Sequence, residues 1–348
     1  AWTDDLTKID IQLGLATSDD GLHWDVSPKP CFEFRSDENL WAYDPRLTVI
    51  EDRCYMCFAV DTRHGIRGGI AVTDDFENFE ILSLSAPDNR NMVLFPEKID
   101  GKYVRLERPF PVYGRAEDEA FDIWASDSPD GRYWGNTRLV LGAERVPYSN
   151  CKIGPAAPPI KTERGWLTLI HAVWKDETRP LKSWKGNWFK QYYAGLLLLD
   201  LEDPMCVIGM SPEPLMVPEP RYEYEIDGYR GNVIFPCGAV LEDDGELKIY
   251  YGASDTVIAL ATARLEDLLE LCQVRLDGAE VAAVRYGQAD ALPEYSRQRG
   301  RHLLQRVVDV EDDRAQELLS RVGQKPVSYT HLRAHETSLH LVCRLLLE

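Results

Sequence analysis

The hydrophobic and polar residues of the chain alternate over short runs, and turns rich in Gly, Pro and acidic residues separate the runs. Alternation with a period of two is typical of β-strands. One kind of strand pair, here called an inner hairpin, consists of a Pro, a short apolar strand, an acidic or Gly turn and a second strand. Inner hairpins are predicted at residues 45–58, 96–109, 158–173 and 236–252.

A second kind of strand pair, here called an outer hairpin, begins with an apolar strand that ends in small residues and continues through a polar turn into another strand. An inner hairpin followed by an outer one gives a four-stranded antiparallel unit of roughly 50 to 75 residues, and such units around one axis form a β-propeller. Outer hairpins are predicted at residues 13–26, 69–82, 122–135, 194–209 and 258–271, the last of which continues as a short C-terminal helix.

The two kinds of hairpin differ in number, five outer against four inner. We therefore predict an all-β, five-bladed β-propeller that lacks its N-terminal half-blade in this chain. The alternative is a first blade that is irregular or closed by another segment. An open propeller leaves unpaired strand edges beside residues 9–18 and 249–260, so we expect the chain to be poorly soluble and nearly inactive. A further upstream segment of roughly 60 residues is expected to restore solubility and activity.

The C-terminal part of the chain follows a different pattern. After residue 272 the alternation stops, and four of the seven His lie in the last 47 residues. We predict a propeller domain over residues 1–272 and an unassigned, partly helical segment over 273–326. Residues 327–348 resemble translated adapter or vector sequence and are expected to be a non-native tail.

Composition and charge narrow the range of partners. The chain has 348 residues, 44% of them hydrophobic, which is enough to bury a large core. Its 39 Lys and Arg against 58 Asp and Glu give a formal net charge of −19. Nucleic acid and anionic membrane surfaces are excluded as partners, because both need a basic surface. A neutral substrate fits, whereas an anionic one needs a local basic pocket.

The positions of the cysteines indicate the cellular compartment and argue against a metal site. Most of the eight lie inside apolar runs, which favours free thiols in the cytoplasm. The first ten residues lack the regions of a signal peptide, and no run is apolar enough for a membrane helix. Cys54 and Cys57 resemble half a zinc site, but in a strand their side chains point to opposite faces, and no second pair follows. We expect no metal and no cofactor.

Six segments, in one order, resemble glycoside hydrolase family 130, the mannoside phosphorylases and related β-mannosidases. The resemblance covers residues from about 10 to 272 and implies that the propeller is the catalytic domain. It implies inverting phosphorolysis of a β-1,4-mannosyl-glucose, a β-1,4-mannosyl-N-acetylglucosamine or a mannooligosaccharide, with inorganic phosphate as co-substrate, and it leaves a homo-oligomer open. The segments are YDPRLTVIEDRCY (43–55), DNRNMVLFPEKIDGKYVRLERP (88–109), KIGPAAPPI (152–160), GWLTLIHAV (165–173), NVIFPCGAV (232–240) and IYYGASDTVIALA (249–261).

Asp44 precedes Pro45, and an Asp–Pro pair is most often a turn former. The resemblance implies that this Asp is the general acid, which protonates the glycosidic oxygen through the 3-hydroxyl of the mannosyl ring. Glycoside cleavage needs a proton on the leaving oxygen while a nucleophile approaches the anomeric carbon. The turn and acid roles are compatible, because Pro45 and the flanking Tyr43 can hold the carboxylate rigidly.

Phosphate is already an anionic nucleophile, so a phosphorylase needs a basic cradle in place of a second carboxylate. Two guanidinium groups can bind phosphate in a bidentate manner. Each Arg alone is more often part of a surface salt bridge, whereas several cations on converging strand ends favour an anion site. The resemblance implies that phosphate and the mannosyl group are bound by Arg90, Asn91, Arg108, Lys152, His171 and Tyr192.

Further residues are candidates for sugar binding. The resemblance implies that Asp255 hydrogen-bonds the mannose, although an Asp there can also cap a turn. Tyr43 flanks the acid, and His64 and Phe235 are candidates for the acceptor side, with core packing as the alternative for Phe235. The basic, Trp-rich segment 174–193 fits a loop on the acceptor side.

Three alternatives to a phosphorylase stay open on the sequence alone. Glu223, Glu225 and Asp227 could supply the base of an inverting β-mannosidase. A family 43-type glycosidase shares the five-bladed fold but uses paired carboxylates on pentosides, and a non-catalytic propeller would bind mannosides without turnover. Family members also carry an Asn-Ser pair and an Arg in the first half-blade, which this chain lacks, and residues 108–121 differ from theirs. The acceptor sugar therefore stays open.

Overall fold

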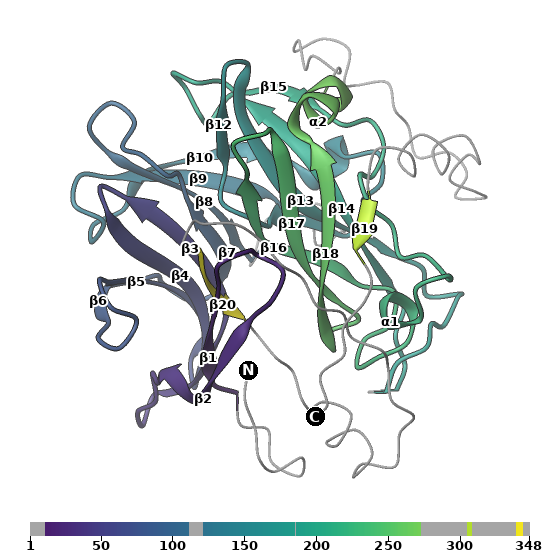
Figure 1. Ribbon diagram of the computed structural model, residues 1–348, viewed down its shortest axis with the longest axis horizontal. Helices are drawn as coiled ribbons and strands as arrows, with labels where there is room; N and C mark the ends of the chain where they lie inside the picture. The colour runs from purple at the N-terminus through teal and green to yellow at the C-terminus, as the bar shows by residue number, and fades with distance from the viewer. Residues whose placement is uncertain (1–10, 111–120, 185, 273–304, 308–338, 344–348) are drawn as a thin grey trace.

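The computed structural model describes residues 11–110, 121–184, 186–272, 305–307 and 339–343. Its strands form five antiparallel sheets that stand side by side around a centre (Figure 1). The helical elements of the described part are short: the 3-10 turn Ala143–Arg145, α1 (Glu223–Ile226) and α2 (Leu265–Leu271). The chain is thus all-β, and the predicted C-terminal helix is α2.

Four of the sheets are blades whose strands follow one another in sequence order. The first blade contains β3 (Asn39–Ile50), β4 (Arg53–Thr62), β5 (Gly65–Thr73) and β6 (Glu80–Leu84). The second contains β7 (Asn89–Leu94), β8 (Tyr103–Pro109), β9 (Ile123–Ser128) and β10 (Gly135–Leu141). The third contains β11 (Lys152–Pro155), β12 (Ile160–Thr162), β13 (Gly165–Lys175), β14 (Lys190–Leu199) and β15 (Val207–Met210). The last contains β16 (Ile234–Leu241), β17 (Glu246–Ala253), β18 (Val257–Arg264) and β19 (Gln305–Val307).

The fifth sheet has three strands, β1 (Leu13–Ser18), β2 (Asp25–Phe32) and β20 (Leu339–Cys343). The count of five complete blades therefore stays a prediction. The prediction that the edges of β1 and β18 lack partners is wrong, because β20 pairs with β1 and β19 pairs with β18. A free strand edge accepts any extended segment that can satisfy its N–H and C=O groups, and alternation alone does not indicate which segment does so.

The hairpin pattern matches the strand pairs with one difference in position. Four outer hairpins are β1–β2, β5–β6, β9–β10 and β14–β15, and the fifth is β18 followed by α2. The second inner hairpin was predicted to begin at Pro96, whereas β7 ends at Leu94. After Pro96 only an isolated bridge joins Ile99 to Lys102. The apolar run that forms the strand stands before the proline.

One turn recurs in the outer hairpins and explains their regular spacing. A hydroxyl residue is followed two positions later by an Asp whose Oδ1 accepts the backbone N–H groups two and three residues ahead. The Asp residues are Asp20, Asp75 and Asp130, with N···O distances of 2.8 Å from Leu22, 2.9 Å from Glu77 and 2.9 Å from Arg132. Each of these turns thus brings the chain back along its own sheet without using tertiary contacts.

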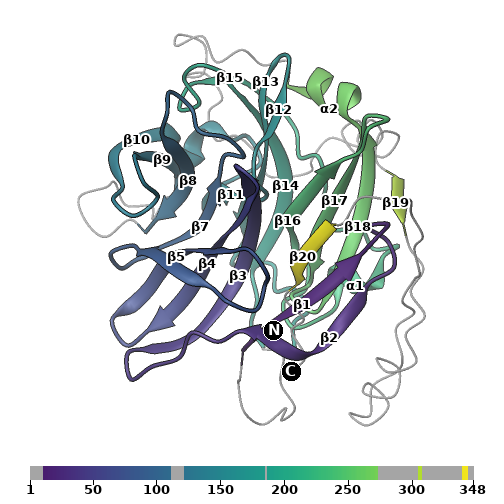
Figure 2. The ribbon, with the colours of Figure 1, turned by 60° about the vertical axis from the view of Figure 1, so that its left-hand side comes forward.

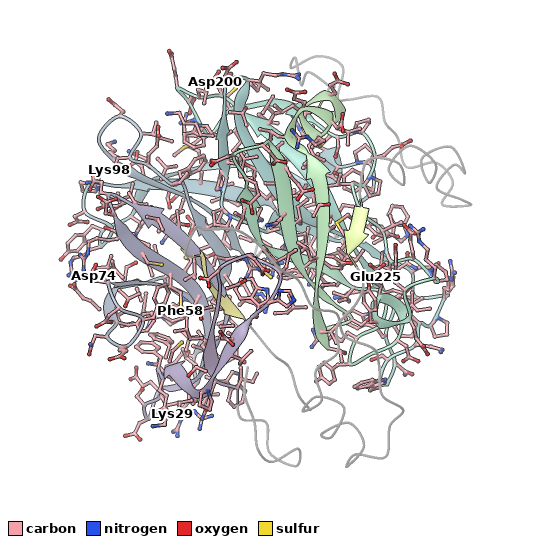
Figure 3. The ribbon with its side chains drawn as sticks, in the orientation of Figure 1. Lys29, Phe58, Asp74, Lys98, Asp200 and Glu225 are labelled. Atoms are coloured by element: carbon pink, nitrogen blue, oxygen red, sulfur yellow. The ribbon has the colours of Figure 1, made fainter. Side chains whose placement is uncertain are left out.

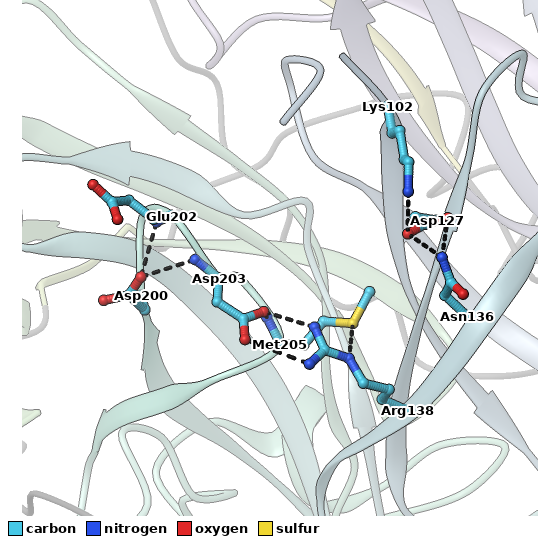
Figure 4. Close-up of polar contacts among 8 residues, drawn as sticks. All are labelled: Lys102, Asp127, Asn136, Arg138, Asp200, Glu202, Asp203 and Met205. Carbon is cyan, nitrogen blue, oxygen red and sulfur yellow. Dashed lines mark hydrogen bonds and ion pairs between the residues drawn. The ribbon is translucent and has the colours of Figure 1, made fainter. Parts of the chain in front are cut away.

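Side chains join the sheets to one another at several levels. At the periphery, Arg138 of β10 donates to the Asp203 carboxylate at 2.8 Å and contacts the sulfur of Met205 in the next blade (Figure 4). Deeper, apolar residues of neighbouring blades form common clusters, for example Leu106 with Ile170. Among the described residues, no helix combines the length and hydropathy that a membrane span requires.

The three-stranded sheet and the last blade close the ring (Figure 2). Tyr250 of β17 donates its hydroxyl hydrogen to the Gly21 carbonyl at 2.5 Å, and Lys248 Nζ donates to the Asp20 carbonyl at 3.0 Å. Trp24 packs edge-on against the Tyr250 ring at 5.7 Å. Gly21 has φ +66°, and a side chain there would overlap the Tyr250 hydroxyl, so glycine is required at this contact.

Candidate active site

Asp44 lies where the pairing of β3 with β4 is interrupted. The register shifts between Tyr43 and Arg46, so that Asp44 and Pro45 together oppose one residue of β4. A bulge of this kind redirects the side chains that it carries. The backbone of Asp44 has φ +53°, in the left-handed region that residues other than glycine seldom adopt. Both features single out Asp44 from the regular strand around it.

A pocket opens between this bulge and the last blade. It brings together Asp44, Phe235 and Asp255, which the sequence analysis had selected from three separate segments. The Arg46 guanidinium lies 5.3 Å from the centroid of the Phe235 ring. Asp255 has φ +51°, and Arg230 lies 3.7 Å from its carboxylate. The full lining is Asp44, Pro45, Arg46, Phe235, Cys237, Gly252, Asp255, Thr256, Val257 and Ile258.

A cluster of buried and half-buried cations stands beside the pocket. Arg90 and Arg108 are direct cross-strand partners in the β7–β8 ladder, and Arg108 is 1% exposed. Arg108 Nη1 donates to His171 Nε2 at 3.1 Å. Burial, together with the charge of Arg90, lowers the pKa of Arg108 to about 9. Burial also opposes the charge on Arg90, but Tyr43 and Asp44 raise the pKa of that guanidinium above its usual value.

Lys152 and His171 extend the cationic cluster into the third blade. Burial and the neighbouring Arg108 and Arg90 lower the pKa of Lys152 well below its usual value. His171 is fully buried, and burial followed by Arg108 lowers its pKa well below its usual value. Gly154 pairs with His171 across the ladder, and a side chain at Gly154 would overlap the imidazole. The strand pair is therefore shaped to admit this ring.

Several polar atoms of the cluster are buried and lack a hydrogen-bond partner among the described residues. A buried donor without a partner costs about 1 to 3 kcal/mol, so a group of them points to a site that an external ligand completes. Asn91, which has φ +56° and is 4% exposed, contributes both side-chain polar atoms. The remaining atoms of the cluster are Arg90 Nε, Arg108 Nε and His171 Nδ1. Arg46 Nη2, which belongs to the neighbouring pocket lining, is buried without such a partner as well.

Aromatic side chains connect the cationic cluster to the pocket and to the surface. The His171 ring lies 4.6 Å from the Phe235 ring and stacks at 6.2 Å on Tyr192, whose pKa burial raises to about 12. Trp188 stacks on the outer side of Tyr192 at 6.1 Å. Tyr43 receives a hydrogen bond from Arg90 Nη1 at 3.3 Å. The arrangement can hold an oxyanion between the guanidinium groups, next to a carboxylic acid and an apolar ring face.

The family model for glycoside hydrolase family 130, described as beta-1,4-mannooligosaccharide phosphorylase, matches residues 3–274. The chain belongs to glycoside hydrolase family 130. A beta-1,4-mannooligosaccharide phosphorylase of Ruminococcus albus is 36% identical over 271 residues, which cover 75% of this chain and 76% of the relative. A beta-1,2-mannobiose phosphorylase of Listeria innocua is 34% identical over 265 residues, covering 75% of this chain and 69% of the relative.

Solved structures agree with membership of family 130. The Listeria innocua beta-1,2-mannobiose phosphorylase in complex with beta-1,2-mannobiose superposes with a TM-score of 0.62 at 33% identity, over 73% of this chain and 67% of that one. A thermostable family-43 glycoside hydrolase shares the fold alone, at 12% identity and a TM-score of 0.51. This family 130 chain is an enzyme, a glycoside phosphorylase.

The structure separates some predicted site residues of this family 130 chain from the others. His64 is exposed on the β4–β5 turn, outside the residues that line the pocket. Glu225, labelled beside α1 in Figure 3, is fully buried and accepts hydrogen bonds from the Tyr251 hydroxyl at 2.8 Å and from the Glu219 N–H at 2.9 Å. Asp227 accepts from Lys182 at 3.1 Å. None of these carboxylates lines the pocket around Asp44.

Two residues at the site escaped the sequence analysis. Asp61 receives hydrogen bonds from Trp41 Nε1 at 2.9 Å and from the Tyr43 hydroxyl at 2.8 Å, which fixes the tyrosine beside Asp44. Arg46 lines the pocket itself. The strand pattern gave no signal for it, because the bulge at Asp44 and Pro45 interrupts the alternation of faces.

Proposed function

We propose that the chain catalyses the inverting phosphorolysis of β-linked mannosides to α-mannose 1-phosphate and a free sugar. Asp44 is the general acid, and its proton reaches the glycosidic oxygen through the mannosyl 3-hydroxyl. An oxygen of phosphate attacks the anomeric carbon from the opposite face as the bond to the leaving sugar breaks. Asp255 and Tyr43 hold the mannosyl ring. The phosphate is held by Arg90, Asn91, Arg108, Lys152, His171 and Tyr192.

The cationic cluster carries this proposal. Arg90 and Arg108 lie opposite each other, although like charges in direct opposition are destabilising. They also have buried Nε donors that no described residue satisfies. A dianion between them removes the repulsion and satisfies the donors. A hydrolase gains nothing from this arrangement, because water carries no charge for it to neutralise.

The placement of the acidic residues supports phosphorolysis over hydrolysis. An inverting hydrolase needs a second carboxylate, about 6.5 to 9.5 Å from the acid, to activate water. Glu225, the most deeply buried of the three candidates for this base, has its oxygens engaged by Tyr251 and by the backbone of Glu219. Asp255 shares the pocket with Asp44, so it is the carboxylate that would have to activate water if the enzyme were a hydrolase.

The acceptor sugar is proposed to lie towards the loop between β13 and β14. Trp184 in this loop is 48% exposed, and its Nε1 donates to Asp227 at 3.2 Å. Its backbone N–H donates to the Gly228 carbonyl at 3.0 Å. The neighbouring Tyr229 N–H donates at 3.0 Å to Thr256 Oγ1, and Thr256 lines the pocket. These hydrogen bonds link the Trp184 loop to Thr256 of the pocket lining, so we propose that the flat face of the indole stacks on the acceptor sugar.

The decisive experiment is an assay of mannoside turnover with and without phosphate. The substrates are β-1,4-mannobiose, β-1,2-mannobiose, β-1,4-mannosyl-glucose and β-1,4-mannosyl-N-acetylglucosamine. Mannose 1-phosphate is followed by phosphorus NMR and free mannose by proton NMR. We expect α-mannose 1-phosphate from at least one of them. Release of free mannose at an equal rate without phosphate would replace the proposal by a β-mannosidase. Binding of these sugars without turnover of any of them would indicate a non-catalytic, sugar-binding propeller.

We further propose that the enzyme works in the cytoplasm. The cysteines whose side chains the structure describes are free thiols, including the buried Cys57 and Cys272. Burial raises the pKa of both to about 12, which keeps these thiols protonated and unreactive. Such a set suits a reducing compartment. Alkylation of the native and the denatured protein, followed by mass spectrometry, tests whether the thiols are free.

A further inference from the structure

Arg46 differs from the cations of the phosphate cluster in what it contacts. Its Nη1 donates to the carbonyl of Pro45 at 3.1 Å, and its Nε donates to the carbonyl of Ala156 in the third blade. The side chain is 2% exposed, and its guanidinium lies 5.3 Å from the Phe235 ring centroid of the last blade. One guanidinium therefore ties together three separate parts of the ring.

The Pro45 carbonyl belongs to the bulge that carries Asp44. This bulge replaces one ladder position with two residues, and it holds Asp44 at φ +53°. A non-glycine residue in the left-handed region costs about 1 kcal/mol or more and persists only where its surroundings enforce it. The Pro45 ring fixes its own φ, but the orientation of its carbonyl at the end of the bulge has to be fixed by other contacts. Arg46 makes such a contact with the Pro45 carbonyl. The same guanidinium also donates to the Ala156 carbonyl, so it joins the bulge to the third blade.

We infer that Arg46 is a positioning residue for the general acid, an inference that rests on the proposed function of Asp44. The guanidinium fork holds the bulge against the third blade and so sets where the Asp44 carboxylate points. Misplacement of a reacting group by about 1 Å can cost on the order of 10²-fold in rate, so the fork has a measurable role. The charge of Arg46 is secondary in this role, because two of its nitrogens already donate to backbone carbonyls.

Two substitutions distinguish the role of the forked guanidinium donors of Arg46 from the role of its positive charge. Arg46→Lys keeps the charge but cannot donate to both carbonyls at once, and Arg46→Met keeps only the apolar stem. We expect both variants to lose kcat by about 10- to 100-fold, with KM for phosphate changed by less than about threefold. Arg67→Met is the matched control, since Arg67 donates to the Ser85 and Leu84 carbonyls away from the pocket lining. It should leave kcat unchanged.

The leaving group distinguishes positioning of the acid from general damage. 4-Nitrophenyl β-mannoside releases a phenolate that needs little protonation, so loss of acid catalysis matters less for this substrate. The kcat deficit of both Arg46 variants should therefore shrink with 4-nitrophenyl β-mannoside. In an Asp44→Asn background, Arg46→Met should cause no further loss, because it acts through a carboxyl group that is no longer present.

The outcomes that overturn the inference are distinct. Near-normal kcat in Arg46→Lys, with KM for phosphate raised in Arg46→Met, would make Arg46 an anion ligand. An equal deficit on both kinds of leaving group, or a further loss on top of Asp44→Asn, would make its role purely structural. If Asp44→Asn itself keeps full activity, the proposed function of Asp44 fails, whatever the Arg46 variants do. Thermal unfolding of each variant shows whether the fold is intact.

Discussion

Arg90 and Arg108 face each other across β7 and β8, with the Nη1 of Arg108 donating at 3.1 Å to His171 and that of Arg90 at 3.3 Å to Tyr43. Two like charges in opposition, one buried and one half-buried, store repulsion that a bound anion relieves. Phosphate at 100 times its Kd should stabilise the protein by about 2.7 kcal/mol, which shifts Tm by roughly 5 to 10 °C. Arg108→Met should remove most of that shift and raise KM for phosphate at least about tenfold.

Thermal unfolding with phosphate and, separately, with chloride at equal ionic strength measures this effect. Arg53→Met is the control, because Arg53 is exposed and its partner Asp74 lies at the surface. A phosphate-induced rise in Tm that is the same in Arg108→Met as in the parent protein would contradict the assignment of Arg108.

The substitution Asp44→Asn tests the acid directly. It should lower kcat by about 10² to 10⁴ while phosphate binding, measured by calorimetry, stays within about threefold. Asp37→Asn changes an exposed carboxylate in the loop before β3 and should leave both quantities unchanged. Turnover by Asp44→Asn at near the parent rate would remove Asp44 from the mechanism.

The lowered pKa of His171 predicts a pH dependence of stability. In the folded protein the imidazole stays neutral well below the pH at which the unfolded chain binds its proton, about 6.5. The unfolded state therefore binds more protons below pH 6.5, so the contribution of His171 to the free energy of unfolding falls as the pH decreases. Between pH 7 and pH 5 the parent protein should lose more stability than His171→Gln. Urea unfolding of both proteins at several pH values measures the difference, and parallel curves would argue against a neutral, buried imidazole.

Trp184 is predicted to act on the acceptor and not on the chemical step. In the synthetic direction, Trp184→Ala should raise KM for an oligosaccharide acceptor by about 3- to 10-fold, the value of one aromatic contact, with little change in KM for mannose 1-phosphate. Tyr133→Ala removes a still more exposed aromatic ring, 77% exposed, on the β9–β10 turn. If both variants behave like the parent protein for every acceptor length, the Trp184 loop has no part in binding.

Several candidate site residues that the structure brings together stand in short, ordered segments of the sequence. His171 lies inside a predicted inner hairpin, and Asp44 and Phe235 directly precede two others; such strands converge near the axis. The choice of these three residues came from the family resemblance. The sequence analysis did not identify Arg46, because a strand pattern does not reveal a bulge. It is the bulge that presents the Pro45 carbonyl to the Arg46 guanidinium. The structure places His64 on an exposed turn outside the pocket lining, and a polar residue in a turn carries no signal for which way the turn points.

The fold could be predicted up to the contacts that are distant in sequence. Alternation and turn residues located the hairpins, since both are local properties. The pairing of β1 with β20 joins residues more than 320 positions apart, Ser18 with Leu339. Nothing local in either strand specifies the other, because β-pairing uses backbone groups that all residues share. For the same reason, the sequence did not predict that β19 pairs with β18.

The contact of Tyr250 with Gly21 has a consequence for biosynthesis. The two residues are 229 positions apart, and the pocket likewise needs both Asp44 and Ile258. A ribosome adding about 5 to 20 residues per second leaves the early strands waiting roughly 10 to 50 s for these partners. During this time the nascent chain exposes strand edges and has no complete pocket, so neither mannoside nor phosphate can assist its folding. Chaperones that shield strand edges are therefore expected to matter most while the last blade is still being translated.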